Sequence, residues 1–251
     1  MLRFDLRYLA AAISHGPRPR ECEASAIGIF EARFAQHLGA DHCIAFGYAR
    51  TAVYATLAAL GLSSGDEVIL PPITIKAMVD AVTSLGLRPV FVDIDPDSLI
   101  FDADALEAAI TPRTRAVLLT YLFGIAADPR RVVAACRARG IVVIEDFSHN
   151  LGATNAGRAC GTFGDVGVYS ASATKALDAF GGGLAVTDDP RLAASLREAQ
   201  AALVEVPRWR LASKVFHALL YNVGTRPFAW SLWAKLRPPT EASTRRLPGA
   251  D

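Results

Sequence analysis

The sequence predicts a three-layer α/β/α domain with a mainly parallel sheet, and two observations lead to this fold class. Between residues 25 and 200, segments with the patterns of strands and of helices alternate along the chain. Such alternation indicates crossover connections, which join parallel strands. The strand segments VFVDI, AVLLT and IVVIE are apolar almost throughout, as expected where helices cover both faces of a sheet.

Each element has its own signal in the sequence. Apolar residues at helical spacing from Ile27 to Leu38 predict a first helix, and Gly39 is placed to end it. Asp104 and Glu107 stand at the spacing of a capping box and predict the start of a later helix. The other helices are expected at residues 51–60, 77–85, 104–110, 129–139 and 190–203. Strands are expected at residues 43–46, 67–70, 89–94, 115–119 and 141–145, followed by two short strands around the loop in GDVGVYSASATKALDAFGGGLAVT.

Composition and charge exclude several classes of protein. The chain has 251 residues, of which 52% are apolar, and a formal net charge of +1, which gives no basis for binding nucleic acid or an anionic membrane. The four cysteines form no C-x-x-C pair, so we expect no metal site and a reduced, cytoplasmic protein. The first 16 residues lack a signal-peptide core. The apolar segment 215–233 is interrupted too often for a membrane span of about 20 residues.

The expected domain organisation follows from these patterns. Residues 1–24 form an N-terminal segment, and residues 25–205 form the α/β domain. Beyond Pro207 the composition shifts to tryptophan, arginine and other aromatic residues, which predicts an aromatic-rich helical segment at residues 206–237. The polar, proline-rich end at residues 238–251 is expected to be disordered.

Residues with catalytic chemistry follow several of the expected strands. In open parallel sheets, ligands bind at the carboxyl ends of the strands. Asp146 and His149 come after one strand, and Ser170 and Lys175 come after another. The turn GYARTA follows the first strand and leads into a helix. Together these features supply an acid, an amine and a cradle for a phosphate group.

Each feature also has a purely structural interpretation. A carboxylate at a strand end often caps the next helix, and a single lysine is usually a solvated surface charge. A lone histidine is more often structural than catalytic, and a turn that contains glycine often serves only the backbone. The order and spacing of all four are harder to explain in this way. A dehydrogenase and a P-loop enzyme are disfavoured, because the run 161–167 reads G-x-x-G-x-x-G before a strand and no Walker motif occurs.

Five stretches of the chain, in order, carry a resemblance to a known family. They are FEARFAQHLGADHCIAFGYARTAVYATLAALGLSSGDEVILPPIT, PVFVDIDPDSLIFDADALEAAITPRTRAVLLTYLFGIAAD, VVIEDFSHNLGA, GTFGDVGVYSASATK and GGGLAVTDD. Together they resemble the DegT/StrS group of nucleotide-sugar aminotransferases, which depend on pyridoxal 5'-phosphate (PLP) and have the aspartate-aminotransferase-like fold. The resemblance implies a PLP-binding large domain of fold type I over residues 25–205.

The resemblance also implies roles for individual side chains. Lys175, in the S-x-x-x-T-K stretch, would hold PLP covalently and then move a proton between substrate and cofactor. Asp146 would face the pyridine nitrogen and keep it protonated, so that the ring withdraws electrons. His149 occupies a position where the family has glutamine or histidine, near the phenolic oxygen of the cofactor.

The phosphate group of PLP would lie at the start of the helix expected at residues 51–60. Backbone N–H groups of Arg50 and Thr51 and the hydroxyl of Ser170 would hold it. Two residues depart from the family pattern. Ile75 stands where members place an aromatic ring against PLP, and Arg50 replaces the glycine of the usual S-G-T. Arg50 either adds charge to the phosphate site or points to solvent.

The family resemblance implies an activity and an assembly. Members transfer an amino group to a keto-sugar nucleotide, with glutamate or glutamine as the expected donor, and complete the active site across a homodimer. They are longer than this chain and end in a smaller domain, so a non-catalytic relative that binds PLP or dimerises without turnover remains an alternative. Elimination is disfavoured, because members that dehydrate sugars have histidine in place of Lys175. A cysteine desulfurase is also disfavoured, because it would need a mobile, positioned cysteine and none of the four lies in a recognisable loop for that role.

Overall fold

The computed structural model describes residues 20–172, 175–179 and 181–203, together with the single residues 213, 216, 217, 220, 228, 231 and 235. The chain divides into two compact units, one of which is Pro17–Glu205. The other unit combines Met1–Gly16 with Val206–Asp251. Apart from the single positions, the expected segments 206–237 and 238–251 lie outside the described residues, as do residues 1–19. The domain boundaries therefore stay predictions.

The core of the unit Pro17–Glu205 is one seven-stranded sheet with the order β1-β9-β8-β5-β4-β2-β3. Strand β9 runs antiparallel to both of its neighbours, and the other pairs are parallel. The prediction of a mainly parallel sheet is confirmed. The strands are β1 (His42–Phe46), β2 (Glu67–Leu70), β3 (Arg88–Phe91), β4 (Thr114–Thr120), β5 (Val142–Asp146), β8 (Val166–Ser170) and β9 (Gly183–Thr187).

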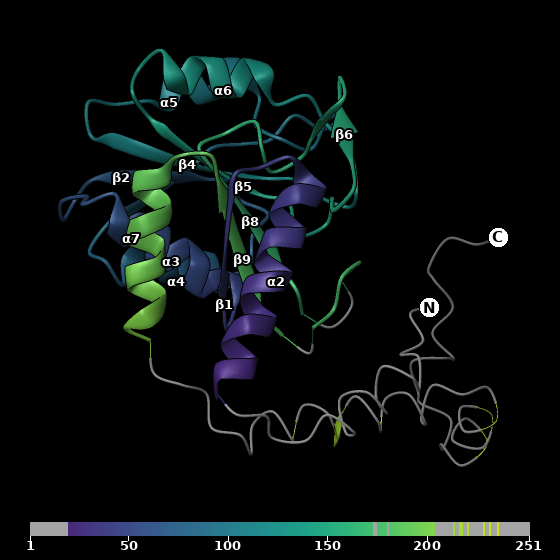
Figure 1. Cartoon of the computed structure of the whole chain (residues 1–251). Coiled ribbons are helices and arrows are strands. Elements are labelled where there is room, and N and C mark those ends of the chain that lie inside the picture. The colour runs from purple at the N-terminus through teal and green to yellow at the C-terminus, as the bar shows by residue number, and fades with distance from the viewer. Residues whose placement is uncertain are drawn as a thin grey trace. The chain divides into compact units, whose positions relative to one another are not determined.

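Helices cover both faces of this sheet, which confirms the three-layer α/β/α architecture (Figure 1). One face packs against α2, α5 and α6 through Phe34, Leu106 and Val132. The other packs against α3, α4 and α7 through residues such as Val53 and Leu196. The helices are α2 (Arg20–Leu38), α3 (Ala49–Ala59), α4 (Lys76–Thr83), α5 (Ala103–Ala109), α6 (Arg130–Arg137) and α7 (Pro190–Ala201). No helix in the described ranges is long and apolar enough to cross a membrane.

Two local predictions differ from the structure. The capping box at Asp104 is wrong: Asp102 is the N-cap of α5, and its carboxylate accepts a hydrogen bond from the Ala105 N–H at 2.7 Å. The chain leaves a β-bridge between Ile94 and Phe101 in extended conformation, so the cap falls on the next residue, Asp102.

A short hairpin, β6 (Thr154–Asn155) with β7 (Arg158–Ala159), was not expected from the sequence. Its turn needs positive φ at two successive residues, 47° at Ala156 and 79° at Gly157. Hairpin turns of this kind usually carry Asn or Asp before the glycine. Because alanine stands there instead, the usual sequence signal is missing.

The glycines of the G-x-x-G-x-x-G run serve packing around a buried carboxylate. A Cβ atom at Gly161 would overlap the Phe147 ring, and one at Gly164 would lie 2.6 Å from the Val143 carbonyl oxygen. The N–H groups of both glycines donate to the carboxylate of Glu145. Burial raises the pKa of Glu145, and these hydrogen bonds counteract part of that effect. The loop thus surrounds a carboxyl group of the protein itself.

Candidate active site

The ends of three neighbouring strands place polar side chains on one face of the sheet. On β4, β5 and β8, the residues two positions earlier are buried in the core beneath α3, α4 and α7. Because side chains alternate along a strand, Thr120, Asp146 and Ser170 lie on that same face. Thr120 and Asp146 are partners in the β4–β5 register. Asp146 and Ser170, two of the predicted site residues, therefore share the carboxyl edge of the sheet.

Asp146 is held by the segment that follows it. Its side chain is only 8% exposed, and one carboxylate oxygen accepts a hydrogen bond from the Ser148 N–H at 3.0 Å. The Ser148 hydroxyl in turn accepts from the Ser170 N–H at 3.0 Å. Ser148 therefore joins the ends of β5 and β8. It was missed as a site residue, although an aspartate side chain commonly accepts a hydrogen bond from the backbone N–H two residues on.

Lys175 lies in the loop between β8 and β9 and is half-buried. Burial lowers the pKa of its amine below the ordinary 10.5, and the negative charge of Asp146 partly raises it again. The two groups are therefore close enough to interact electrostatically. A lowered pKa leaves more of the amine unprotonated, which is the form that acts as nucleophile or base.

His149 is held by the loop that follows β4. Its Nδ1 accepts a hydrogen bond from the Phe123 N–H at 3.3 Å, and the two rings stack with centroids 6.3 Å apart. Phe123 has φ +55°, a strained value for a non-glycine residue. Burial lowers the pKa of His149, the positive charge of Lys175 lowers it further, and Asp146 raises it. Because Nδ1 accepts this hydrogen bond, the neutral His149 ring carries its proton on Nε2.

The start of α3 lies at the same edge, directly after β1. Arg50 is exposed, and its guanidinium lies 4.0 Å from the centroid of the Tyr48 ring. The Thr51 N–H donates to the Tyr48 carbonyl at 3.0 Å, so this amide already has a partner. Ala49 and Arg50 are the first two residues of α3, so their N–H groups have no acceptor within the helix.

The remaining predicted residues also lie at this edge. The Ser170 hydroxyl is 2.9 Å from that of Ser172. Ile75 is the N-cap residue of α4, after β2, and its side chain is 62% exposed.

The donors and charges at this edge fit PLP. The start of α3 offers N–H groups that have no acceptor within the helix, which suit a phosphate. The hydroxyl oxygen of Thr120, which is the register partner of Asp146, is buried and has no hydrogen-bond partner within the described residues. It can receive a polar atom of a bound group. Asp146 offers a buried carboxylate, and Lys175 offers an amine with lowered pKa.

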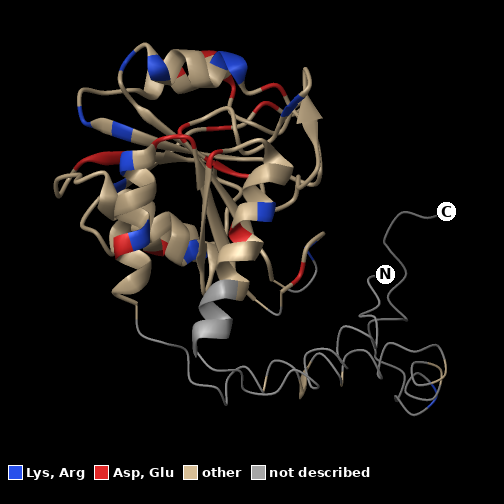
Figure 2. Cartoon of the chain, in the orientation of Figure 1, with Lys and Arg blue, Asp and Glu red and all other residues tan. Residues whose placement is uncertain are grey.

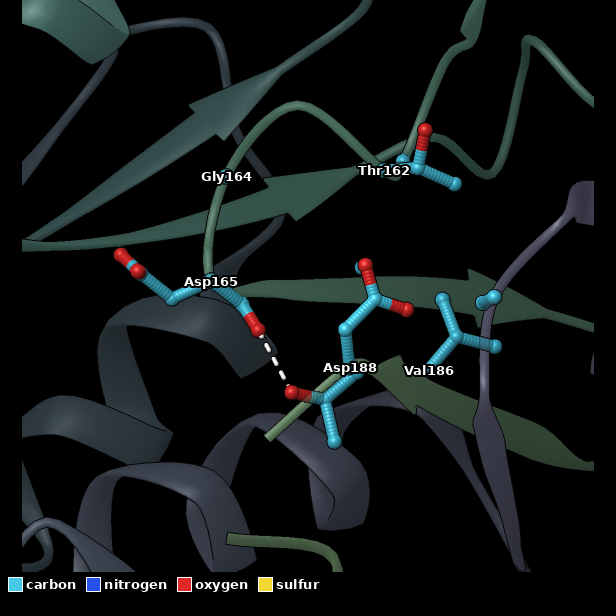
Figure 3. Close-up of a pocket in the computed structure, with 9 residues that line it drawn as sticks. Thr162, Gly164, Asp165, Val186 and Asp188 are labelled. Carbon is cyan, nitrogen blue, oxygen red and sulfur yellow. Dashed lines mark hydrogen bonds between the residues drawn. The ribbon is translucent and has the colours of Figure 1, made fainter. Parts of the chain in front are cut away.

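A small pocket lies at the opposite edge of the sheet (Figure 3). Thr162, Asp165 and Asp188 are among its lining residues, and its volume is about 10 Å³, enough for one water molecule. Both carboxylates already accept hydrogen bonds, Asp165 from the Val143 N–H and Asp188 from the Asp41 N–H. Within the described ranges, no group of three His, Cys, Asp or Glu side chains is arranged to hold a metal ion.

The sheet order, with a single antiparallel strand β9 and a lysine loop between β8 and β9, defines the class of the protein. It is the large-domain architecture of PLP-dependent transferases of fold type I. The chain belongs to the DegT/DnrJ/EryC1/StrS aminotransferase family, whose profile matches residues 23–218.

Two curated relatives and one solved structure illustrate the similarity. L-Glutamine:2-deoxy-scyllo-inosose aminotransferase of Streptomyces kanamyceticus is 41% identical over 68% of this chain and 40% of its own length. dTDP-4-dehydro-2,3,6-trideoxy-D-glucose 4-aminotransferase of Saccharopolyspora spinosa is 39% identical over 72% of this chain and 46% of its own. The chain thus spans less than half the length of these relatives.

The solved structure is the E. coli GDP-4-keto-6-deoxy-D-mannose-3-dehydratase with bound hydrated PLP. It is 30% identical to this chain, superposes with a TM-score of 0.65, and is matched over 68% of this chain and 46% of its own.

Proposed function

We propose that this protein is a PLP-dependent aminotransferase that moves an amino group from glutamate or glutamine to a keto-sugar nucleotide. The observation that carries the proposal is the arrangement at the carboxyl edge of the sheet, where the buried Asp146 ends β5, Ser170 ends the neighbouring β8, and Lys175 follows in the loop after β8. The family of the chain supports the reaction class.

The residues of the edge divide the chemistry between them. When bound, PLP supplies a carbonyl group that condenses with amines and a ring that withdraws electrons. Lys175 would hold the cofactor through its unprotonated amine, and the freed amine would move a proton at the substrate carbon. Asp146 would keep the ring nitrogen protonated through the negative charge of its carboxylate. His149 would donate a hydrogen bond from Nε2 to the phenolic oxygen.

The phosphate group and one face of the ring require further contacts. The N–H groups at the start of α3 and the Ser170 hydroxyl would bind the phosphate, and the dipole of α3 would favour its negative charge. Arg50 would add positive charge from the same turn. Ile75 would pack against the ring with an aliphatic side chain in place of an aromatic one.

The substrates and the assembly are inferred from relatives and from the surface. One relative is named for L-glutamine, another for a dTDP-linked sugar, and the dehydratase for a GDP-linked sugar. These names support an amino-acid donor and a nucleotide-sugar acceptor. Large apolar side chains are exposed in the loops after β2 and β4, which supports a homodimer that covers this edge. They are Ile73, Ile75, Phe123 and Ile125.

The visible absorbance of the protein with PLP tests the proposal. We expect the wild-type chain to develop a band of covalently attached PLP that L-glutamate or L-glutamine converts to the spectrum of the aminated cofactor. Lys175→Ala should lose the band. Lys76→Ala is the matched control and should keep it, because Lys76 is exposed and paired with Asp80 at 2.6 Å.

Each other outcome has a defined meaning. A band that neither amino acid changes would favour the alternative function, a relative that binds PLP without turnover. The exposed, aliphatic Ile75 favours that alternative. If Lys175→Ala keeps the band, Lys175 is not the lysine that holds the cofactor, and the proposal fails.

A further inference from the structure

Tyr169 stands directly before Ser170 on β8, but its side chain points to the opposite face of the sheet. Its ring is fully buried, with ring centroids 5.7 Å from Phe34 and 5.5 Å from Phe147. These contacts explain why the position is aromatic. They do not explain why the ring carries a hydroxyl group, which phenylalanine would lack.

The hydroxyl makes two hydrogen bonds to a single residue of the lysine loop. It donates to the Leu177 carbonyl oxygen at 3.2 Å and accepts from the Leu177 N–H at 2.8 Å. Burial raises the pKa of Tyr169, so the group keeps the proton that it donates. Leu177 also packs its half-buried side chain against the same core. A rigid strand and an aromatic cluster thus hold the loop two residues beyond Lys175.

The base of the loop is tied by a separate set of bonds. The Ala171 carbonyl accepts from the N–H groups of Ala179 and Gly181, and the Ala171 N–H donates to Gly182. Between these ties and Lys175, the Tyr169 hydroxyl holds the backbone of Leu177, and the Lys175 N–H donates to the Ser172 carbonyl at 3.1 Å. Without it, the backbone N–H and carbonyl of Leu177 would lose a partner.

We propose that Tyr169 is a positioning residue for Lys175: its hydroxyl fixes the loop so that the amine stays at the edge of the sheet beside Asp146. This inference rests on the proposed role of Lys175. The residue acts through the backbone of Leu177 and does not touch the cofactor. The proposal predicts that loss of one oxygen atom on the far face of the sheet changes the reactivity of Lys175.

The test compares Tyr169→Phe with Tyr121→Phe in the full chain. Tyr121 is the matched control, because it is also a buried tyrosine at a strand end, but its hydroxyl donates to Glu145 at 2.6 Å. The first measurement is hydrogen exchange of the protein without PLP. In Tyr169→Phe we expect the peptides covering 171–182 to exchange roughly tenfold faster, as the loss of one to two hydrogen bonds implies. Tyr121→Phe should leave them unchanged.

The second measurement is the pH profile of Lys175 modification by an amine reagent such as trinitrobenzenesulfonate. The sequence contains four lysines, so Lys175 can be quantified separately, and the exposed Lys76 is an internal reference. We expect the midpoint for Lys175 to move in Tyr169→Phe, the midpoint for Lys76 to stay, and covalent uptake of PLP to weaken several-fold.

The outcomes separate this inference from the proposed function. Unchanged exchange in Tyr169→Phe overturns the tether. Faster exchange with an unchanged Lys175 profile also overturns the proposal, because the hydroxyl then stabilises the loop without positioning the amine. If wild type never attaches PLP, the proposed function fails, but exchange and amine labelling still decide the role of Tyr169.

Discussion

At the scale of single residues, the negative charge of Asp146 affects how its neighbours Lys175 and His149 bind protons. Its carboxylate raises the pKa of both Lys175 and His149, while burial lowers the pKa of both. Lys175 also lowers the pKa of His149. Removing the charge of Asp146 is therefore expected to alter how Lys175 and His149 bind protons.

Asp146→Asn should lower the pKa of Lys175 further, because the change removes the negative charge that favours the protonated amine. In amine labelling without PLP, the midpoint for Lys175 should move to lower pH. With PLP, aminotransferase activity should fall by about 10² or more, since the ring nitrogen loses its charged partner. Asp104→Asn is the control, because Asp104 is exposed and pairs with Arg131. An unchanged Lys175 midpoint in Asp146→Asn would contradict the electrostatic coupling.

The hydrogen bond from Phe123 predicts the tautomer of His149. Because its Nδ1 accepts, the proton of the neutral ring should sit on Nε2, and ¹⁵N NMR at neutral pH should show Nδ1 as unprotonated. The lowered pKa means that the neutral form persists to lower pH than the ordinary 6.5 allows. The folded state then binds fewer protons than the unfolded state, so this residue costs stability as pH falls through that range.

His149→Gln identifies the resonances by their disappearance. A proton on Nδ1 at neutral pH would show that the bond from Phe123 does not form in solution.

At the scale of secondary-structure elements, the most informative contact is the close packing of β9 against the start of α3. At Gly183, the first residue of β9, an added Cβ atom would overlap the backbone of Tyr48 and Ala49. A β-bridge between Tyr48 and Gly182 adds to this contact. The strand after the lysine loop thus directly supports the helix start that is proposed to bind phosphate.

Gly183→Ala should therefore weaken both folding and PLP binding. Overpacking of this kind costs about 1–3 kcal/mol of unfolding free energy, measurable in urea. PLP affinity should fall as well, because α3 must move away from β9. Gly28→Ala is the control: it lies in α2 with open space around it, and should stabilise the helix by about 0.5–1 kcal/mol. Unchanged PLP affinity in Gly183→Ala would show that the packing of β9 against α3 does not affect phosphate binding.

The sequence predicted the elements well where its patterns are local. Strand β2 lies at Glu67–Leu70 as expected, and α7 begins at Pro190 as expected. The β6–β7 hairpin was missed, because its turn lacks the usual residues. The capping box failed because the neighbouring β-bridge determines where α5 begins, and that bridge joins residues seven positions apart.

At the scale of the molecule, positive and negative residues are interspersed along the described helices and strands (Figure 2). Two exposed ion pairs join α6 and the turn after it to α5, Arg131 with Asp104 at 3.0 Å and Arg139 with Glu107 at 2.8 Å. Exposed pairs of this kind contribute little to stability, at most about 1 kcal/mol each. The apolar side chains after β2 and β4 remain the more informative surface feature.

If these side chains are covered by a second copy, the protein should be a dimer in light scattering after size exclusion. Ile73→Asp should lower the dimer fraction at equal concentration, because it places a charge in an apolar contact. Ile29→Asp is the control, because Ile29 is comparably exposed but lies on α2. A wild-type monomer at the highest concentration used would contradict the proposed assembly.

The sequence by itself determined the fold class, the family resemblance and the residue types with catalytic chemistry. Periodicity and strand order along the chain are local properties, and residues after parallel strands must meet at one edge. Only the tertiary structure decided that β9 runs antiparallel, that Ser148 joins two strand ends, and that Tyr169 holds the loop of Lys175. Such contacts depend on which distant backbone groups the packed core brings within hydrogen-bond distance, and no local pattern encodes that distance.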